Sequence, residues 1–169
     1  DYSLALAQAA SVVSDNYDAY AVNTAGIYAT AYAGYASTAV AGGIEVLAPN
    51  GSAYLYNGDI YAIAEAGDFS VAVASAASVQ GYEYASATSY GLVVAGAYVG
   101  DYSYALASGF DVAASNGYAY LYNGYATYAT AIAGDNSLAQ AFGPSVDGLY
   151  GASTVNPGHI EAFAYSGDY

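Results

Sequence analysis

The sequence predicts an all-β repeat protein, a thin β-solenoid, from three observations: a fixed repeat length, a strand-like alternation and regularly spaced turn residues. Stretches ending in Ala-Gly or a close variant recur in steps of 33, 33 and 34 residues (28 to 61, 61 to 94, 94 to 128), and a weaker copy ends at Gly167. These stretches are Tyr28–Gly34, Tyr61–Gly67, Val94–Gly100 and Tyr128–Gly134. A fixed period of this length indicates stacked units, none of which buries its apolar face alone.

We expect a single repeat domain over residues 1–169. Its five units are 1–34, 35–67, 68–100, 101–134 and 135–167, and residues 168–169 open a sixth. The residues that follow each boundary recur as well, because DYSLALA begins at Asp1, DFSVAVA at Asp68 and DYSYALA at Asp101. The repeat therefore keeps one phase along the whole chain.

Each unit divides into four segments of about eight residues, which we expect to be short strands. In the fourth unit they are 101–109, 110–117, 118–124 and 125–134, and each ends in a Gly that predicts a turn. Within the segments Ala alternates with Tyr, Val or Ile, which is the period of a strand and not of a helix. Helices are therefore not expected, despite the high Ala content.

Two neighbouring segments would make one flat coil of 16 or 17 residues. We expect about ten such two-sided coils, which at about 4.8 Å per coil form a rod of roughly 48 Å. The alternative is one larger coil per repeat, with five coils and half that length. The runner-up fold is a β-sandwich subunit.

The preference for thin coils comes from positions that hold only small residues in all units. The partner positions accept residues as different as Tyr61, Val94 and Glu161, so they face space or water, while the restricted positions point into a narrow interior. The opposite orientation, with Leu4, Leu6, Val71 and Val73 inside, is the alternative. The restricted positions are Ser3, Ser37, Ser70, Ser103 and Ser137; Ala5, Ala39, Ala72, Ala105 and Ala139; Ala7, Ala41, Ala74, Ala107 and Ala141; Ala29, Ala62, Ala95, Ala129 and Ala162; and Ala31, Ala64, Ala97, Ala131 and Ala164.

The composition excludes several function classes. The chain has 14 acidic residues, one His, no Lys or Arg and no Cys. Without cationic side chains it has no means to bind nucleic acid or anionic lipid by charge. Disulfides and thiolate metal sites are impossible. The sequence contains no run of 18 or more apolar residues, so no membrane span is predicted. If the protein is secreted, we expect Asp1 to be the mature start.

Two decapeptides carry a family resemblance. GDNSLAQAFG at 134–143 and GDYSYALASG at 100–109 resemble the head repeats of trimeric autotransporter adhesins and other Ala-rich bacterial β-solenoid repeats. The resemblance covers about ten residues per repeat, and the adhesin repeat is shorter and places larger aliphatic residues inward. It implies an extracellular, non-enzymatic β-solenoid and transfers no functional residue.

One column of carboxylates is a candidate metal site. Stacked carboxylates about 5 Å apart repel one another, and Ca²⁺ could bridge them through oxygen ligands. The competing interpretation is an exposed turn Asp bonded to its own backbone, and no cofactor other than this candidate Ca²⁺ is expected. The column consists of Asp1, Asp68, Asp101, Asp135 and Asp168, and Tyr35 interrupts it.

Three further features are weighed against plainer interpretations. His159 lies in an NPGHIE loop with no nucleophile motif nearby, so we expect a surface His without a catalytic role. Asn50 begins the Asn-Gly-Ser glycosylation sequon. The Tyr-rich stretches 53–58 and 119–124 are candidate sugar-stacking platforms, or else outward Tyr ladders that stabilise the sheet or meet another subunit.

These observations favour a structural, self-assembling subunit of an extracellular or cell-surface homopolymeric filament, and not an enzyme. Strand stacking would join copies head to tail through Asp1, Tyr2, Asp168 and Tyr169, because uncapped strands recruit another chain. An ice-binding protein is one alternative, although the Thr residues do not form a regular outward array. A surface adhesin module that binds glycan or host protein is the other.

Overall fold

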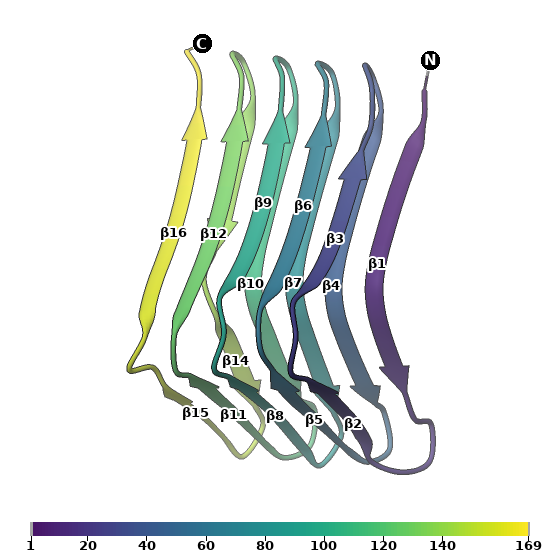
Figure 1. Cartoon of the computed structure of the whole chain (residues 1–169), viewed down its shortest axis with the longest axis vertical. Helices are drawn as coiled ribbons and strands as arrows, with labels where there is room; N and C mark the ends of the chain where they lie inside the picture. The colour runs from purple at the N-terminus through teal and green to yellow at the C-terminus, as the bar shows by residue number, and fades with distance from the viewer. Residues whose placement is uncertain (1, 169) are drawn as a thin grey trace.

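The computed structural model describes residues 2–168, which wind into a β-solenoid of five coils (Figure 1). Each coil contributes one strand to each of three parallel sheets, called here sheets A, B and C, except that the last coil contributes two strands to sheet A. Sheet A contains β1 (Leu4–Val13), β4 (Thr38–Ala48), β7 (Val71–Gly81) and β10 (Tyr104–Ala114), followed in the last coil by β13 (Leu138–Phe142) and β14 (Ser145–Gly148). Sheet B contains β2 (Ala19–Asn23), β5 (Ser52–Asn57), β8 (Tyr84–Ser89), β11 (Tyr118–Asn123) and β15 (Gly151–Val155). Sheet C contains β3 (Ile27–Tyr32), β6 (Ile60–Ala66), β9 (Val93–Val99), β12 (Ala126–Ala133) and β16 (His159–Ser166).

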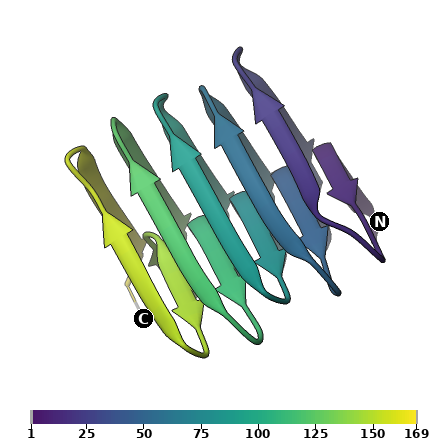
Figure 2. The ribbon, with the colours of Figure 1, turned by 90° about the horizontal axis from the view of Figure 1, so that it is seen from below.

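The repeat sets the register of all three sheets. Paired residues lie 32 to 34 positions apart, as in Ala53 with Ala85, Ala39 with Ala72 and Ala105 with Ala139, so equivalent positions of successive repeats lie side by side. Figure 2 shows the coils following one another along one axis, seen from below. At about 4.8 Å per coil the stack is about 24 Å long. The predicted β-solenoid is confirmed.

The predicted number of coils was wrong, because one repeat makes one coil and not two. Gly109 was interpreted as a turn between two strands, but it lies inside β10, which runs from Tyr104 to Ala114. At this point the in-and-out alternation is interrupted, since Gly109 and Phe110 are both buried. The strand therefore bends and continues, and the two predicted segments form one long strand of sheet A. The three parallel sheets also differ from the runner-up β-sandwich.

The predicted orientation of the small residues is confirmed. In the inner coils the Ala columns of sheets A and C are buried, while Leu4 and Leu6 point outward and are 70% and 69% exposed. Neighbouring Ala41 and Ala64 belong to strands that contact each other across the interior. Here the interior is as narrow as the volume limit of the columns predicts.

The other end of the interior is wider than predicted. Phe110, Ile60, Leu121 and Val79 are fully buried where the bent half of sheet A meets sheet B and the start of sheet C. The interior is not restricted to methyl and hydroxymethyl groups throughout. Since hydrophobic stabilisation grows with buried apolar area, this wide end supplies the large side chains that the narrow end lacks.

Candidate functional site

Both ends of the solenoid present open strand edges. In the described residues, β1, β2 and β3 pair with the second coil alone, and β13 to β16 pair with the fourth coil alone. Parallel strands that pair on one side leave the backbone N–H and C=O groups of the other side free for another strand. The first and last coils are therefore surfaces on which a further coil can add.

The apolar interior is partly uncovered at these ends, on sheet A of the first coil and on sheets A and C of the last coil. Ala72 and Ala105 of the inner coils are 0% exposed, whereas Ala5 and Ala139 of the same column are only partly buried. On sheet C, Ala62 is 0% exposed and its counterpart Ala162 in the last coil is exposed. No capping element covers these columns within residues 2–168.

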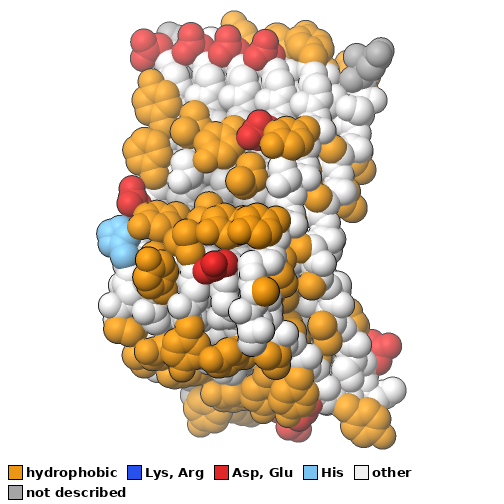
Figure 3. All heavy atoms as spheres, in the orientation of Figure 1, with side chains coloured by type: hydrophobic (Ala, Val, Ile, Leu, Met, Phe, Trp, Pro, Cys, Tyr) orange, Lys and Arg blue, Asp and Glu red, His pale blue; other side chains and the backbone are white. Residues whose placement is uncertain are grey.

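The predicted Asp column is brought together by the turns that lead from sheet C to sheet A. The Asp101 N–H donates to Asp68 Oδ1 (3.0 Å), the Asp135 N–H to Asp101 Oδ1 (2.8 Å) and the Asp168 N–H to Asp135 Oδ1 (3.1 Å). Figure 3 shows acidic side chains in a row along this edge. Each carboxylate thus bonds to the backbone of the next coil, and not to its own backbone as the plainer interpretation held.

A serine column next to it runs in the opposite direction. The backbone N–H of Ser70 donates to Ser103 Oγ (2.9 Å), and that of Ser103 donates to Ser137 Oγ (2.9 Å). Each hydroxyl also donates to the carbonyl two residues before it, as Ser103 Oγ does to Asp101 O (2.8 Å). The Asp and Ser columns together pin the turn of one coil to that of the next, which explains why both recur in the sequence.

The residue between Asp and Ser adopts a left-handed backbone, which the sequence did not indicate. Its φ is 55° at Phe69, 53° at Tyr102 and 53° at Asn136. Only Asn among these three tolerates that conformation readily. The Phe69 and Tyr102 rings stack at 5.0 Å with an interplanar angle of 7°, so the turn also projects an aromatic row.

The Asp column was also predicted as a candidate metal site. Within residues 2–168 no group of three or more His, Asp or Glu side chains gathers as it would around an ion. Asp1 and Tyr169, which belong to the predicted metal and self-association sets, lie outside the described residues, and Tyr2 is exposed. The Ca²⁺ interpretation stays a prediction.

Asn50 and His159 are both exposed. The Asn50 Nδ2 atom, to which a glycan would attach, donates to the Asp15 carbonyl (2.6 Å) from an exposed turn. His159 Nε2 lies 3.4 Å from Glu161 Oε2, and its ring lies 5.7 Å from that of Tyr128. Glycosylation of Asn50 stays a prediction. No helix long and apolar enough to cross a membrane occurs in the part of the chain that the structure describes.

The Tyr residues form ladders on the outer faces. Tyr20 and Tyr54 stack at 4.7 Å on sheet B, and Tyr28 and Tyr61 stack at 4.8 Å on sheet C. Both pairs are register partners of adjacent coils. Tyr90 lies between Tyr56 and Tyr122 at 5.3 and 5.4 Å. Figure 3 shows the resulting apolar bands, which run across several coils.

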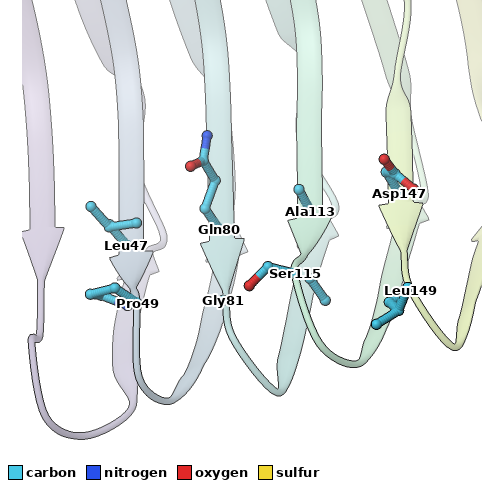
Figure 4. A pocket seen from close by; sticks show the side chains of 9 residues that line it. Leu47, Pro49, Gln80, Gly81, Ala113, Ser115, Asp147 and Leu149 are labelled. Atoms are coloured by element: carbon cyan, nitrogen blue, oxygen red, sulfur yellow. The ribbon is translucent and has the colours of Figure 1, made fainter.

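A groove on the outer face of sheet A was not predicted. It measures about 530 Å³ and opens above Ala113, between Leu47 and Pro49 on one side and Asp147 and Leu149 on the other (Figure 4). The strand register explains the groove: the column that holds Leu47 in the second coil holds the smaller Ala113 in the fourth. The groove gathers few polar groups and has no cluster of catalytic side chains.

Comparison with known proteins identifies no relative: no family model, no curated protein and no solved structure matches the chain.

Proposed function

We propose that this protein is a structural subunit that assembles, coil upon coil, into an extracellular homopolymeric filament, and that it is not an enzyme. The observation that carries the proposal is the pair of open strand edges on the first and last coils, where parts of the apolar interior are also uncovered. Ala5 of the first coil and Ala139 and Ala162 of the last coil are more exposed than their fully buried counterparts in the inner coils, although Ala29 on sheet C of the first coil is only 3% exposed. A head-to-tail contact between such ends extends without closing.

The two ends are complementary because the inward Ala columns carry the same residue type at equivalent positions in every coil. If the first coil of one copy follows the last coil of another, Ala5 lies over Ala139, and Ala29 lies over Ala162, as in the inner coils. Asp168 already fills the place that follows Asp135 in the aspartate column.

An extracellular site is supported by the composition. The chain carries no Lys or Arg, so it offers no cleavage site to trypsin-like proteases, which suits a long-lived exposed material. No specific observation favours either ice binding or glycan binding. Thr30 and Thr130 share a column on sheet C, but Ile63 and Gly96 interrupt it.

Electron microscopy of the purified protein tests the proposal. We expect unbranched filaments with an axial rise of about 24 Å per subunit, which is five coils at about 4.8 Å. A stable monomer at every concentration, observed by light scattering and microscopy, would contradict it.

Two neighbouring substitutions distinguish coil stacking from other association. Ala162→Glu places a carboxylate in an inward column of the open end, where stacking would bury it without a partner. Phe163→Glu adds the same charge on the outward face of the same strand. We expect Ala162→Glu to abolish filaments and Phe163→Glu to preserve them, with both variants folded by circular dichroism.

A further inference from the structure

The outer face of sheet B holds a tyrosine pair with a carboxylate fixed against one of its phenols. The rings of Tyr20 and Tyr54 lie 4.7 Å apart with an interplanar angle of 6°. The Tyr20 hydroxyl donates to Asp18 Oδ2 (3.2 Å). The other oxygen, Asp18 Oδ1, accepts the backbone N–H of Ser52 (2.8 Å), which holds the carboxylate in place.

We propose that Tyr20 and Tyr54 are a site of oxidative cross-linking, in which a one-electron oxidant such as a peroxidase intermediate joins them as dityrosine and Asp18 accepts the phenolic proton of Tyr20. The bond would link the first coil to the second within one molecule. This modification goes beyond the filament proposal and does not depend on it.

The reaction balances as a two-electron oxidation. The oxidant removes one electron from Tyr20 as its Oη–H proton passes to Asp18 Oδ2, and a second equivalent oxidises Tyr54 with loss of its phenolic proton. The two phenoxyl radicals form one bond between carbons ortho to the hydroxyls, and each ring then moves its displaced hydrogen to oxygen. The product has lost two hydrogens in total, and one hydrogen peroxide molecule accepts them and becomes two water molecules.

The geometry favours coupling within the pair. The two residues are direct register partners, so their rings extend from adjacent strands in the same direction. Stacked rings must rotate before their ortho carbons meet, and exposed side chains rotate freely. Tyr20 is exposed and Tyr54 is partly exposed. Holding two reacting groups together replaces a collision between molecules with an internal step.

The pair on sheet C is an internal control. Tyr28 and Tyr61 stack almost identically, at 4.8 Å and 3°. The nearest acidic residue in sequence, Asp59, directs Oδ1 to the backbone N–H of Leu92 (2.8 Å). Neither phenol of this pair donates to a carboxylate within the described residues. The two pairs therefore differ in the proton acceptor and not in the stacking.

The experiment treats the dilute, non-assembled chain with a haem peroxidase and hydrogen peroxide. Tandem mass spectrometry locates the cross-linked peptides by their loss of two hydrogens, and dityrosine fluorescence follows the rate. We expect the Tyr20–Tyr54 product to form at a rate independent of protein concentration, and about tenfold or more faster than the Tyr28–Tyr61 product, since a positioned base accelerates proton transfer by at least that factor.

Two variants isolate the roles. Asp18→Asn keeps an oxygen for the Ser52 N–H but removes the base, and we expect it to slow Tyr20–Tyr54 coupling to the rate of Tyr28–Tyr61. Tyr20→Phe keeps the stacked ring and should eliminate the product while leaving Tyr28–Tyr61 coupling unchanged. Tyr17→Phe, at an exposed Tyr with no ring partner in the described chain, is the matched control. Equal rates for the two pairs, an unaffected Asp18→Asn variant, or cross-links that form only between molecules would overturn the proposal.

Discussion

Individual residues of the interior show where the repeat is imperfect. Thr127 is 0% exposed and occupies the column that holds Ile60 and Val93 in earlier coils, yet its hydroxyl has no hydrogen-bond partner. A buried hydroxyl without a partner costs the free energy of its lost hydration. The aliphatic column accommodates the shape of the Thr127 side chain but offers its hydroxyl no hydrogen-bond partner.

We predict that Thr127→Val stabilises the protein by about 1–3 kcal/mol, because Val has the same shape and removes the unsatisfied oxygen. The unfolding midpoint in urea measures the effect. Thr130→Val, three residues along the same strand on the outward side, is the control and should change the midpoint little. A Thr127→Val variant less stable than the original would show that the hydroxyl has a partner, such as a buried water.

Asp111 is a second residue whose surroundings are unfavourable, in this case for the ionised form of its side chain. Burial, and then the negative charge of Asp147, raise the pKa of the Asp111 carboxyl above its usual range. A group whose pKa is higher in the folded state than in the unfolded state destabilises the fold when it is ionised, and this penalty disappears as the pH falls below the unfolded value.

We therefore predict that Asp111→Asn raises the unfolding midpoint at neutral pH, and that the gain shrinks to nothing as the pH falls below about 4, where an unfolded Asp protonates. Thermal unfolding followed over this pH range measures it. Asp147→Asn removes the neighbouring charge alone and should give a smaller gain. A gain that persists unchanged in acid would exclude the electrostatic cause.

At the scale of the element, the long strands of sheet A bend where a small residue faces a large one. A Cβ atom added to Gly43 would collide with the backbone carbonyl oxygen of Ala76 in the neighbouring strand and lie 2.6 Å from Ile60 Cγ2, and one added to Gly109 would lie 2.6 Å from Thr127 Cγ2. At Gly43 the missing side chain leaves room for the backbone of the neighbouring strand as well as for the start of sheet C, so this glycine serves close approach and not a turn, whereas the equivalent position in the third coil holds Ala76.

Replacing Gly43 with Ala should therefore cost about 1–3 kcal/mol, since inserting a methyl group into a filled interior displaces backbone or side chains. Gly34→Ala is the matched control, because a Cβ at Gly34 meets nothing within 4 Å. Chemical denaturation of both variants compares them directly. Equal stability of the two would mean that the bend opens without cost.

At the scale of the whole molecule, charge opposes the assembly that the open ends favour. The formal net charge is −14, with no Lys or Arg, so two copies repel as they approach. Salt screens such repulsion over a Debye length of about 30 Å at 0.01 M and about 3 Å at 1 M.

We predict that filament formation increases with ionic strength, and that the critical concentration falls as NaCl rises from about 0.01 M to about 1 M. Light scattering against protein concentration measures it. NaCl of equal ionic strength is the control for ion bridging: if Ca²⁺ promotes assembly far beyond NaCl, and Asp101→Asn removes that difference, the Asp column binds the ion. Assembly that weakens with salt would point to an attractive electrostatic contact instead.

The sequence alone determined the period, the strand alternation and the inward direction of the Ala and Ser columns. These properties depend on local sequence or recur in every unit, so the same pattern can be recognised in each copy of the repeat. The Asp column was predicted as a column for the same reason, although its bonds to the next coil were not.

The tertiary structure decided how many strands make a coil and which outer residues meet. A glycine such as Gly109 is compatible with a turn or with a bend within a strand, and only the structure shows that it lies inside β10, close to Thr127 on the other side of the interior. The contact of Tyr20 with both Tyr54 and Asp18 likewise depends on the pairing of two coils. Such features arise between segments far apart in the chain, where packing distance and not local preference sets the outcome.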